Sequence, residues 1–196
     1  LLNTHRPVMI GVEDMAMEFV KRKTNFTGLP WFCEREKVSR ERDREKKKNI
    51  LITGGGTTSL TENLLEAAMR LQHAKNTTVS LDAILYQRVP DGGSFQKFLF
   101  TQEAFQALDW IVCRPGLGIL TDAVKYKIPV CALKEVNKEI MYNAERVEEL
   151  GIGIVFKNLT DTEEIIEKSD PGEFQDAFNS LRTGGAAMAA DMILNQ

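Results

Sequence analysis

The stretch DWIVCRPGLGILTD, from Asp109 to Asp122, decides the fold of this chain. It begins with the apolar run Trp110 to Cys113, which has the length and the β-prone residues of a buried strand. Arg114, Pro115 and two glycines then interrupt the run, and apolar residues return at helical spacing from Ile119. The stretch therefore predicts a strand, a tight glycine turn and a helix in immediate succession.

The glycine turn of this stretch predicts a binding site for an anion. Gly116 and Gly118 carry no β-carbon, so a ligand can come close to the free backbone N–H groups at the start of the helix. A helix N-terminus also carries a partial positive charge, which favours phosphate. Asp122 follows one turn later, where its carboxylate can meet the hydroxyls of a sugar attached to that phosphate. These residues favour a nucleotide-sugar diphosphate site, and a turn that needs glycine only for its own closure is the alternative.

A second strand, turn and helix with the same order begin at Asn49. Residues 50–53 predict a buried strand, GGGTTS follows at residues 54–59, and residues 60–71 have the apolar spacing of an amphipathic helix. The turn is neither a P-loop nor a dinucleotide fingerprint. Its amides still suit a phosphate or a sugar, as do the hydroxyls of Thr57, Thr58 and Ser59.

The rest of the chain alternates short apolar runs with helical patterns. The predicted strands are residues 78–85, 95–100, 128–133 and 153–156, and the predicted helices are residues 101–108, 138–150, 162–168, 172–181 and 185–194. This alternation predicts an α/β fold, with a Rossmann-like parallel sheet that carries helices on both faces. Ligands of such sheets bind beyond the carboxyl ends of the strands, where both glycine turns are expected.

The N-terminal part of the chain has a different character. Residues 7–12 predict a strand, residues 13–22 a helix, and TGLP at residues 27–30 a sharp break. Almost every residue from 34 to 48 is charged, with both signs mixed, which predicts a solvated helix or a flexible connector. Because acids offset much of the basic charge, a role of this segment in binding nucleic acid or lipid is the less favoured alternative.

Composition and charge exclude several classes of protein. No apolar run approaches the about 18 residues that a membrane-spanning helix needs. The net charge of −3 argues against a nucleic-acid partner. The three cysteines, Cys33, Cys113 and Cys131, are odd in number and far apart, which predicts reduced thiols in a cytoplasmic protein and neither a disulfide framework nor a zinc site.

Several motifs follow one another in an order that is more specific than any one of them. ILITGGGTTS at residues 50–59 is followed by CRPG at residues 113–116, by the acid Asp122, by IPVCAL at residues 128–133 and by the pair Asn143-Ala144. GGAAMAADMIL closes the series at residues 184–194. In this order the motifs resemble the C-terminal, donor-binding half of GT-B glycosyltransferases, above all the group of the bacterial N-acetylglucosaminyltransferase that completes lipid II.

The resemblance implies a domain organisation and a function. Residues 1–48 are then a remnant of an N-terminal domain with a charged linker, and residues 49–196 are the nucleotide-sugar-binding C-terminal domain. The donor is expected to be a UDP-sugar, bound without a metal or another cofactor. Because the family keeps its catalytic base in the N-terminal domain, the resemblance identifies no catalytic residue here. It implies that transfer needs that domain, in the same chain or as a partner subunit, and it allows peripheral membrane association through that other half.

The resemblance also implies roles for single residues. Asp122 stands in place of the family's glutamate that binds the ribose hydroxyls, the glycine turn before it faces the diphosphate, and residues 98–100 supply backbone contacts to the base. Glu139 and Ile140 replace the glutamine pair that holds the donor sugar, which points either to another sugar or to a domain that has lost catalysis. The expected donor-binding residues are Gly55, Gly56, Thr57, Thr58, Phe100, Arg114, Gly116, Gly118, Asp122, Glu139 and Asn143.

Some alternatives stay open at this point. Arg114 is either a phosphate ligand or a surface cation at a strand end, and Asp122 is either a ribose ligand or an exposed carboxylate. Glu139 and Asn143 lie four residues apart on one helix face, which either meets the donor sugar or is solvated. The chain as a whole is alternatively a non-catalytic soluble subunit of a split glycosyltransferase, or a nucleotide-sugar hydrolase or epimerase of the same fold.

Overall fold

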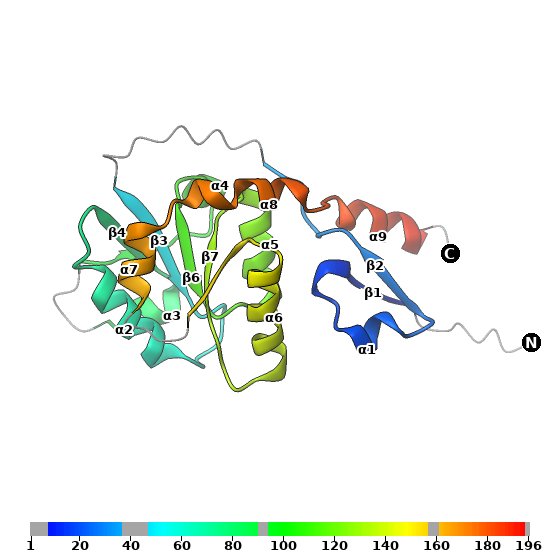
Figure 1. Cartoon of the computed structure of the whole chain (residues 1–196), viewed down its shortest axis with the longest axis horizontal. Coiled ribbons are helices and arrows are strands. Elements are labelled where there is room, and N and C mark those ends of the chain that lie inside the picture. Colours follow the sequence, from blue (N-terminus) through cyan, green and yellow to red (C-terminus); the bar gives the residue numbers. More distant parts are fainter. Residues whose placement is uncertain (1–7, 37–46, 90–93, 157–160, 195–196) are drawn as a thin grey trace, which may run out of the picture.

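A six-stranded parallel sheet forms the core of the larger part of the molecule (Figure 1). The computed structural model describes residues 8–36, 47–89, 94–156 and 161–194. The strands lie side by side in the order β5-β4-β3-β6-β7-β8. Their bounds are β3 Lys48–Thr53, β4 Thr77–Leu81, β5 Gln96–Lys97, β6 Trp110–Cys113, β7 Val130–Leu133 and β8 Gly153–Phe156.

The strand order creates a switch point in the middle of the sheet. The chain enters this sheet at β3, moves outward through β4 to β5, returns to β6 beside β3, and then moves outward in the other direction to β8. The connections on the two sides of β3 and β6 therefore run in opposite directions. In open parallel sheets a crevice forms at such a point, beyond the carboxyl ends of the two strands.

Helices cover both faces of the sheet and complete two hydrophobic cores. Ile50 and Ile52 of β3 face the core that includes Leu64 of α2, whereas Leu51 faces the core that includes Leu120 of α5. This alternation follows from the two-residue period of a strand that is buried on both faces. The helices are α2 Thr61–Leu71, α3 Ala83–Tyr86, α4 Gln102–Gln106, α5 Leu117–Tyr126, α6 Lys138–Glu149, α7 Asp161–Lys168 and α8 Gln175–Ser180.

The predicted α/β fold with a parallel, Rossmann-like sheet and helices on both faces is confirmed. In the part of the chain that the structure describes, no helix has both the length and the apolar character that crossing a bilayer demands.

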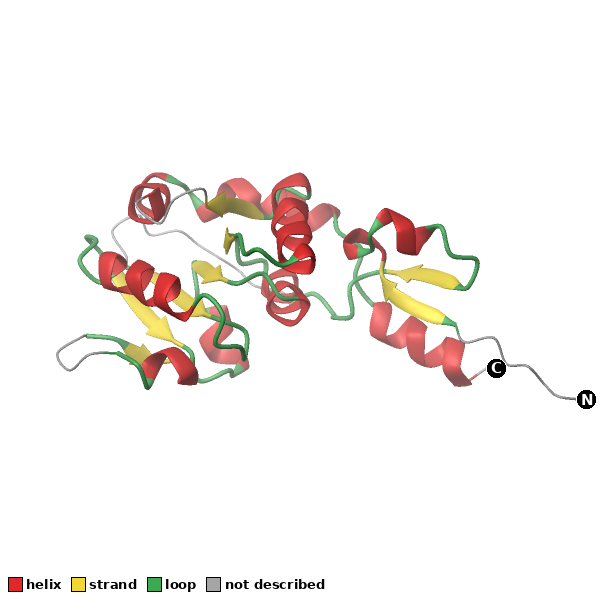
Figure 2. Cartoon of the chain, turned by 90° about the horizontal axis from the view of Figure 1, so that it is seen from below, coloured by secondary structure: helices red, strands yellow, loops and turns green. Residues whose placement is uncertain are grey.

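A smaller unit lies at one end of the molecule, beyond α6, in both views of the chain (Figures 1 and 2). It contains the parallel pair β1 Met9–Val12 and β2 Phe26–Leu29, a 3₁₀ turn at Glu13–Met15, and the short helix α1 Glu18–Lys21. The last helix, α9 Gly185–Leu194, returns to this unit and packs beside β2. The division of the chain at residue 48 stays a prediction, and α9 lies with the first unit.

Hydrogen bonds tie the smaller unit to the rest of the chain. Tyr142 of α6 donates its hydroxyl to the carbonyl of Ala16 at 2.9 Å, and Arg146 donates its Nε–H to the carbonyl of Asp14 at 2.8 Å. The Gly185 N–H donates to the carbonyl of Trp31 at 2.9 Å, which holds the start of α9 against the segment after β2.

Two elements of the structure differ from the prediction. In one a side chain outweighs the local sequence pattern, and in the other a strand pairing does. The strand predicted at residues 78–85 ends at Leu81, because the Asp82 carboxylate accepts the N–H groups of Ile84 and Leu85 and thereby caps α3. The break predicted at TGLP is wrong for its first three residues, which lie in β2. There Gly28 pairs with Gly11 of β1, and this pairing outweighs the turn signal.

Other predicted elements are shorter or divided. The strand predicted at residues 95–100 is only Gln96–Lys97, and the helix predicted at residues 13–22 is a 3₁₀ turn followed by the four residues of α1. The helix predicted at residues 172–181 begins as a 3₁₀ helix at Pro171–Phe174 and continues as α8. Most of the charged segment, at residues 37–46, lies outside the described residues.

We expect Gly153→Ala to destabilise the fold, because a β-carbon at this position would lie 2.0 Å from the Val130 carbonyl oxygen of β7. Relief of this overlap requires β7 and β8 to move apart, and such overpacking costs about 1–3 kcal/mol of unfolding free energy. Urea denaturation measures the change. The matched control is Gly118→Ala in α5, where a β-carbon meets no atom within 4 Å. Equal stability of the two variants would contradict the expectation.

Candidate functional site

The two predicted glycine turns lie next to each other at the switch point. β3 and β6 pair in register to their last residues, Thr53 and Cys113, so the two turns that follow start side by side. The Arg114 N–H donates to the Thr53 carbonyl at 3.3 Å, which extends the pairing one residue into the second turn. Because β7 runs parallel to β6, the segment that joins Leu133 to α6 begins at the same edge of the sheet as the two turns.

The helices that follow these two turns start without a side-chain cap. α2 begins after Leu60 and α5 begins after Gly116, and in neither case does a side chain accept the first N–H groups. By contrast, Asp82, Thr101 and Asn137 cap α3, α4 and α6 with side-chain oxygens. The first-turn amides of α2 and α5 therefore lack the side-chain acceptor that those three helices provide for themselves.

The two turns contain glycine for different structural reasons. Gly55 and Gly56 have φ angles of +67° and +83°, which other residues rarely adopt, so the backbone itself requires glycine there. At Gly116 and Gly118 the φ angle imposes no such demand, and an added β-carbon would meet no atom within 4 Å. The packing of the described residues thus leaves open space beside the start of α5.

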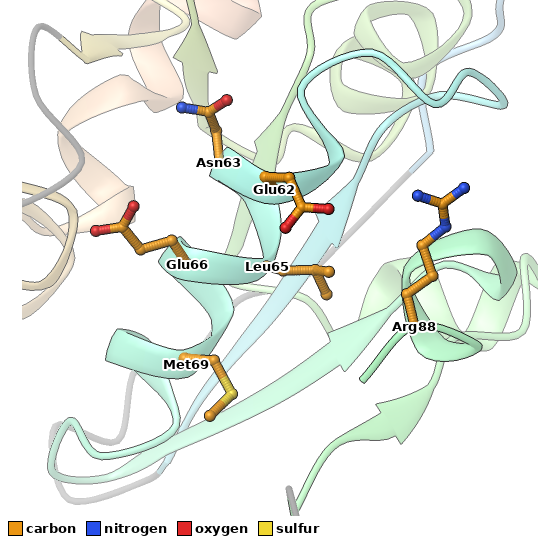
Figure 3. A pocket seen from close by; sticks show the side chains of 6 residues that line it. All are labelled: Glu62, Asn63, Leu65, Glu66, Met69 and Arg88. Atoms are coloured by element: carbon orange, nitrogen blue, oxygen red, sulfur yellow. The ribbon is translucent and has the colours of Figure 1, made fainter. Parts of the chain in front are cut away.

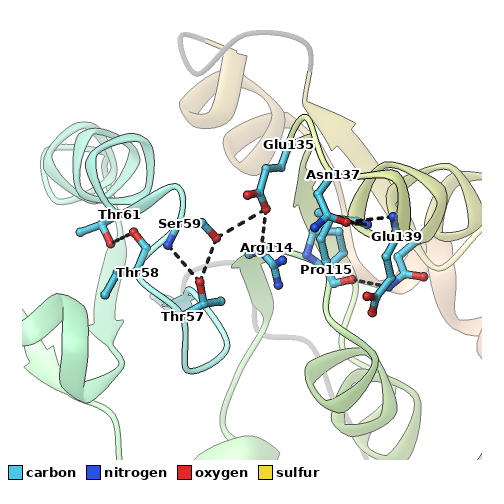
Figure 4. A network of polar contacts seen from close by, with 11 residues as sticks. Thr57, Thr58, Ser59, Thr61, Arg114, Pro115, Glu135, Asn137 and Glu139 are labelled. Atoms are coloured by element: carbon cyan, nitrogen blue, oxygen red, sulfur yellow. Dashed lines mark hydrogen bonds and ion pairs between the residues drawn. The ribbon is translucent and has the colours of Figure 1, made fainter.

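A network of polar side chains joins the two turns (Figure 4). Arg114 donates its Nε–H to Glu135 Oε2 at 2.7 Å, and Ser59 Oγ lies 3.5 Å from the same carboxylate oxygen. Ser59 in turn lies 2.9 Å from the hydroxyl of Thr57, which also accepts the Ser59 N–H at 3.0 Å. Glu135 follows β7, so residues after three neighbouring strands meet in one network.

Buried side chains hold each turn from below. Asp82 is 5% exposed, and its Oδ2 accepts both the Thr53 hydroxyl and the Gly54 N–H at 2.8 Å. Asn143 is also 5% exposed, and its amide donates to the Pro115 carbonyl at 2.9 Å. The alternative that Asn143 lies on a solvated helix face is therefore wrong, because α6 turns this residue toward the β6–α5 turn.

Asp122 lies outside the network and is only partly exposed. Burial raises the pKa of its carboxyl above the ordinary value of 3.8, and the ammonium of Lys125 one turn later opposes this shift. Burial also raises the pKa of the nearby Cys33 thiol to about 11, and the charge of Asp122 adds to that effect. No described residue donates a hydrogen bond to the Asp122 carboxylate, so that a half-buried acid keeps its acceptors available.

The remaining predicted residues are placed as follows. Glu139, Gly55, Gly56 and Thr58 are exposed, and the carbonyl of Thr58 accepts the Thr61 hydroxyl at 2.6 Å. Phe100 is 55% exposed and packs edge-on against Phe98 at a centroid distance of 5.0 Å. Among the described residues, no hydrogen bond or ion pair joins Phe100 or Asp122 to the network around Glu135.

A hollow of about 730 Å³ lies apart from the network, on the outer side of α2 (Figure 3). Glu62, Leu65, Glu66 and Met69 line it from α2, and Arg88 lines it from the turn after α3. It contains none of the predicted donor-binding residues. Among the described residues no three potential metal ligands come together, and independence of metal stays a prediction.

Sequence patterns missed two residues that organise this site. Glu135 carries no motif of its own, and only the position of β7 beside β6 brings its carboxylate to Arg114. Asp82 was included in a predicted strand, although an aspartate directly after an apolar run is a signal for a helix N-cap. That signal was available in the sequence, whereas the one for Glu135 required the strand order.

In sequence, the chain matches no family model and no curated protein. In structure, it is similar to the calicheamicin glycosyltransferase CalG4, with a TM-score of 0.62 and 17% identity over 96% of this chain and 51% of that chain. It is similar to the Streptomyces sp. SF2575 glycosyltransferase SsfS6, solved with thymidine diphosphate, with a TM-score of 0.61 and 17% identity over 94% and 52% of the two chains. MurG of Acinetobacter baumannii matches with a TM-score of 0.55 and 18% identity over 78% and 51%.

The chain spans about half the length of the solved structures that it matches. At this level of identity the likeness shows the fold, which is that of one half of a GT-B glycosyltransferase. The resemblance to the C-terminal half that the sequence motifs predict is therefore confirmed for the fold.

We expect Asn143→Ala to destabilise the chain, because it leaves the buried Pro115 carbonyl without its donor. An unpaired buried polar group costs about 1–3 kcal/mol of unfolding free energy. The matched control is Asn63→Ala on the exposed face of α2, which makes the same change of helix propensity without a buried partner. Thermal or urea unfolding of both variants measures the difference, and an Asn143→Ala variant as stable as Asn63→Ala would refute the role of this hydrogen bond.

Proposed function

We propose that this chain, which has the fold of the C-terminal half of a GT-B glycosyltransferase, binds a nucleoside-diphosphate sugar as the donor half of a metal-independent transferase. One observation carries the proposal. Both strands at the switch point, β3 and β6, are followed by a glycine turn and then by a helix whose first amides have no side-chain cap. Two helices that begin after neighbouring strand ends are proposed to offer a diphosphate the partial positive charge of their N-termini.

The proposed site supplies the stabilisation that the reaction needs at its leaving group. Transfer of a sugar from a nucleoside diphosphate develops negative charge on the departing diphosphate, and fixed N–H donors lower the energy of that charge. We assign this task to the amides at the start of α5 and to the guanidinium of Arg114. The open space beside Gly116 and Gly118 admits a ligand close to those amides.

Two other residues are proposed to hold the nucleoside. Asp122 has a half-buried carboxylate without a hydrogen-bond donor among the described residues, which suits the hydroxyls of a ribose. The backbone of residues 98–100 is proposed to contact the base, and the ring of Phe100 in this segment is exposed. We propose UDP as the first nucleotide to test and dTDP as the second, since SsfS6 was solved with thymidine diphosphate.

Complete transfer is proposed to require a second half. The reaction also needs a base that deprotonates the acceptor. The similar solved structures are about twice as long as the matched region, so the acceptor site and the base are assigned to a domain of the same protein or to a partner subunit.

We expect calorimetry to detect binding of UDP or dTDP, and weaker binding of GDP. The affinity should be the same in EDTA and in magnesium, because backbone amides and Arg114 contact the diphosphate in this proposal. Gly118→Ala should weaken binding of the nucleotide, since its β-carbon enters the open space beside α5, while the unfolding free energy stays at or above that of the wild type because alanine favours a helix more than glycine does. Equally weak binding of all three nucleotides, or none, would overturn the proposed function.

We expect Asp122→Asn to weaken the binding free energy of UDP by about 1–3 kcal/mol, the range for buried hydrogen-bonding groups that lose a partner. Binding to the wild type should weaken as the pH falls toward the raised pKa of Asp122, because the protonated carboxyl accepts hydroxyls less well.

Loss of the Asp122 charge should weaken nucleotide binding but should not lower the unfolding free energy. A raised pKa means that the folded state holds this proton more tightly than the unfolded state, so ionisation of Asp122 lowers the stability at neutral pH. Asp122→Asn should therefore be as stable as the wild type or more stable at neutral pH. Asp176→Asn, which changes an exposed acid of α8, is the control. Unchanged UDP affinity in Asp122→Asn would leave Asp122 as a surface carboxylate.

A further inference from the structure

In the part of the chain that the structure describes, the guanidinium of Arg114 is bound on one side only. Its Nε–H donates to Glu135 at 2.7 Å, and the two side chains are 17% and 22% exposed. A guanidinium has five N–H donors, of which four belong to the two terminal Nη groups. Among the described residues these Nη groups have no hydrogen-bond acceptor. The pair with Glu135 thus fixes the plane of the guanidinium and leaves the edge that suits two phosphate oxygens available.

Glu135 also reaches the other glycine turn. Its Oε2, which accepts from Arg114, lies 3.5 Å from the hydroxyl of Ser59 after β3. Ser59 is held in turn by Thr57 (Figure 4). One carboxylate therefore touches both turns from a third segment, at the edge of the sheet where all three strands end.

The carboxylate of Glu135 has two opposing effects on a diphosphate ligand. A carboxylate beside a site for a diphosphate repels the ligand, so its charge alone would weaken binding. An arginine without a fixed partner must lose more side-chain freedom when it binds phosphate, and a partner that has already ordered it removes part of that cost. The two effects have opposite signs, which allows one experiment to separate them.

We propose that Glu135 is a positioning residue, which orients Arg114 toward the diphosphate and joins the two glycine turns into one site. The inference rests on the proposed function, because it takes the ligand to be a nucleoside diphosphate. It adds that this acid, placed where its charge opposes the ligand, strengthens binding through Arg114.

Calorimetry with UDP and with uridine tests the inference, or with dTDP and thymidine if the wild type prefers dTDP. Glu135→Ala removes both the charge and the acceptor, and should weaken UDP about tenfold while uridine affinity stays unchanged. Glu135→Gln removes the charge and keeps an oxygen that accepts the Arg114 Nε–H. It should therefore bind UDP within about threefold of the wild type or more tightly.

A double mutant identifies the path of the effect. In an Arg114→Ala background, Glu135→Ala should no longer weaken UDP, because the side chain that it positions is absent. The control is Glu145→Ala, which breaks the 3.7 Å ion pair of the neighbouring Lys134 and should leave UDP binding unchanged. The affinity for uridine and the unfolding free energy of each variant report whether the fold is intact.

The inference is overturned if Glu135→Ala binds UDP as tightly as the wild type or more tightly, since charge repulsion would then be the larger effect. It is also overturned if Glu135→Ala weakens UDP and uridine equally, or weakens UDP as much in the Arg114→Ala background. A wild-type chain that binds neither nucleotide contradicts the proposed function instead, so the two failures are distinguishable.

Discussion

The parallel pairing of β3 with β6 is the constraint on which the rest of the site depends. The two strands are far apart in sequence, yet they pair from Ile50 with Trp110 to Thr53 with Cys113 and end together. A slip of one residue would turn every side chain of one strand to the opposite core. The register that fills both cores therefore also sets the two glycine turns beside each other, so core packing and the geometry of the site have one cause.

The helices that follow the two glycine turns lack the side-chain caps of α3, α4 and α6, and buried side chains stabilise the turns instead. Leu60 adopts a φ angle of +61° at the start of α2, a conformation that costs free energy for a residue with a side chain. Asp82 accepts the buried Gly54 N–H in the turn before α2, and Asn143 donates to the buried Pro115 carbonyl in the turn before α5. Neither side chain accepts from the first-turn amides of α2 or α5, and those two helices also lack a side-chain cap. These bonds stabilise two turns that lead into helices without a side-chain cap.

The sequence predicted the alternation of strands and helices well, since the two-residue and 3.6-residue periods are local properties of the chain. It failed where a tertiary contact outweighed the local signal. Gly28 and Leu29 have the composition of a turn, but the pairing of β2 with β1 makes them a strand. The return of α9 to the segment after β2 was not predicted either, because nothing in residues 185–194 identifies the distant partner Trp31.

By itself the sequence determined that two strand–turn–helix units carry glycine turns directly after their strands, because apolar runs and glycine turns are local signals. It also placed the hydroxyls of residues 57–59 and the guanidinium of Arg114 at the ends of strands. Only the tertiary structure decided that Arg114 and the hydroxyls of Thr57 and Ser59 meet in one network, since the strand order β5-β4-β3-β6-β7-β8 brings Glu135, after β7, beside them. Glu135 became recognisable only there, because a carboxylate acquires its role from the neighbours that folding supplies.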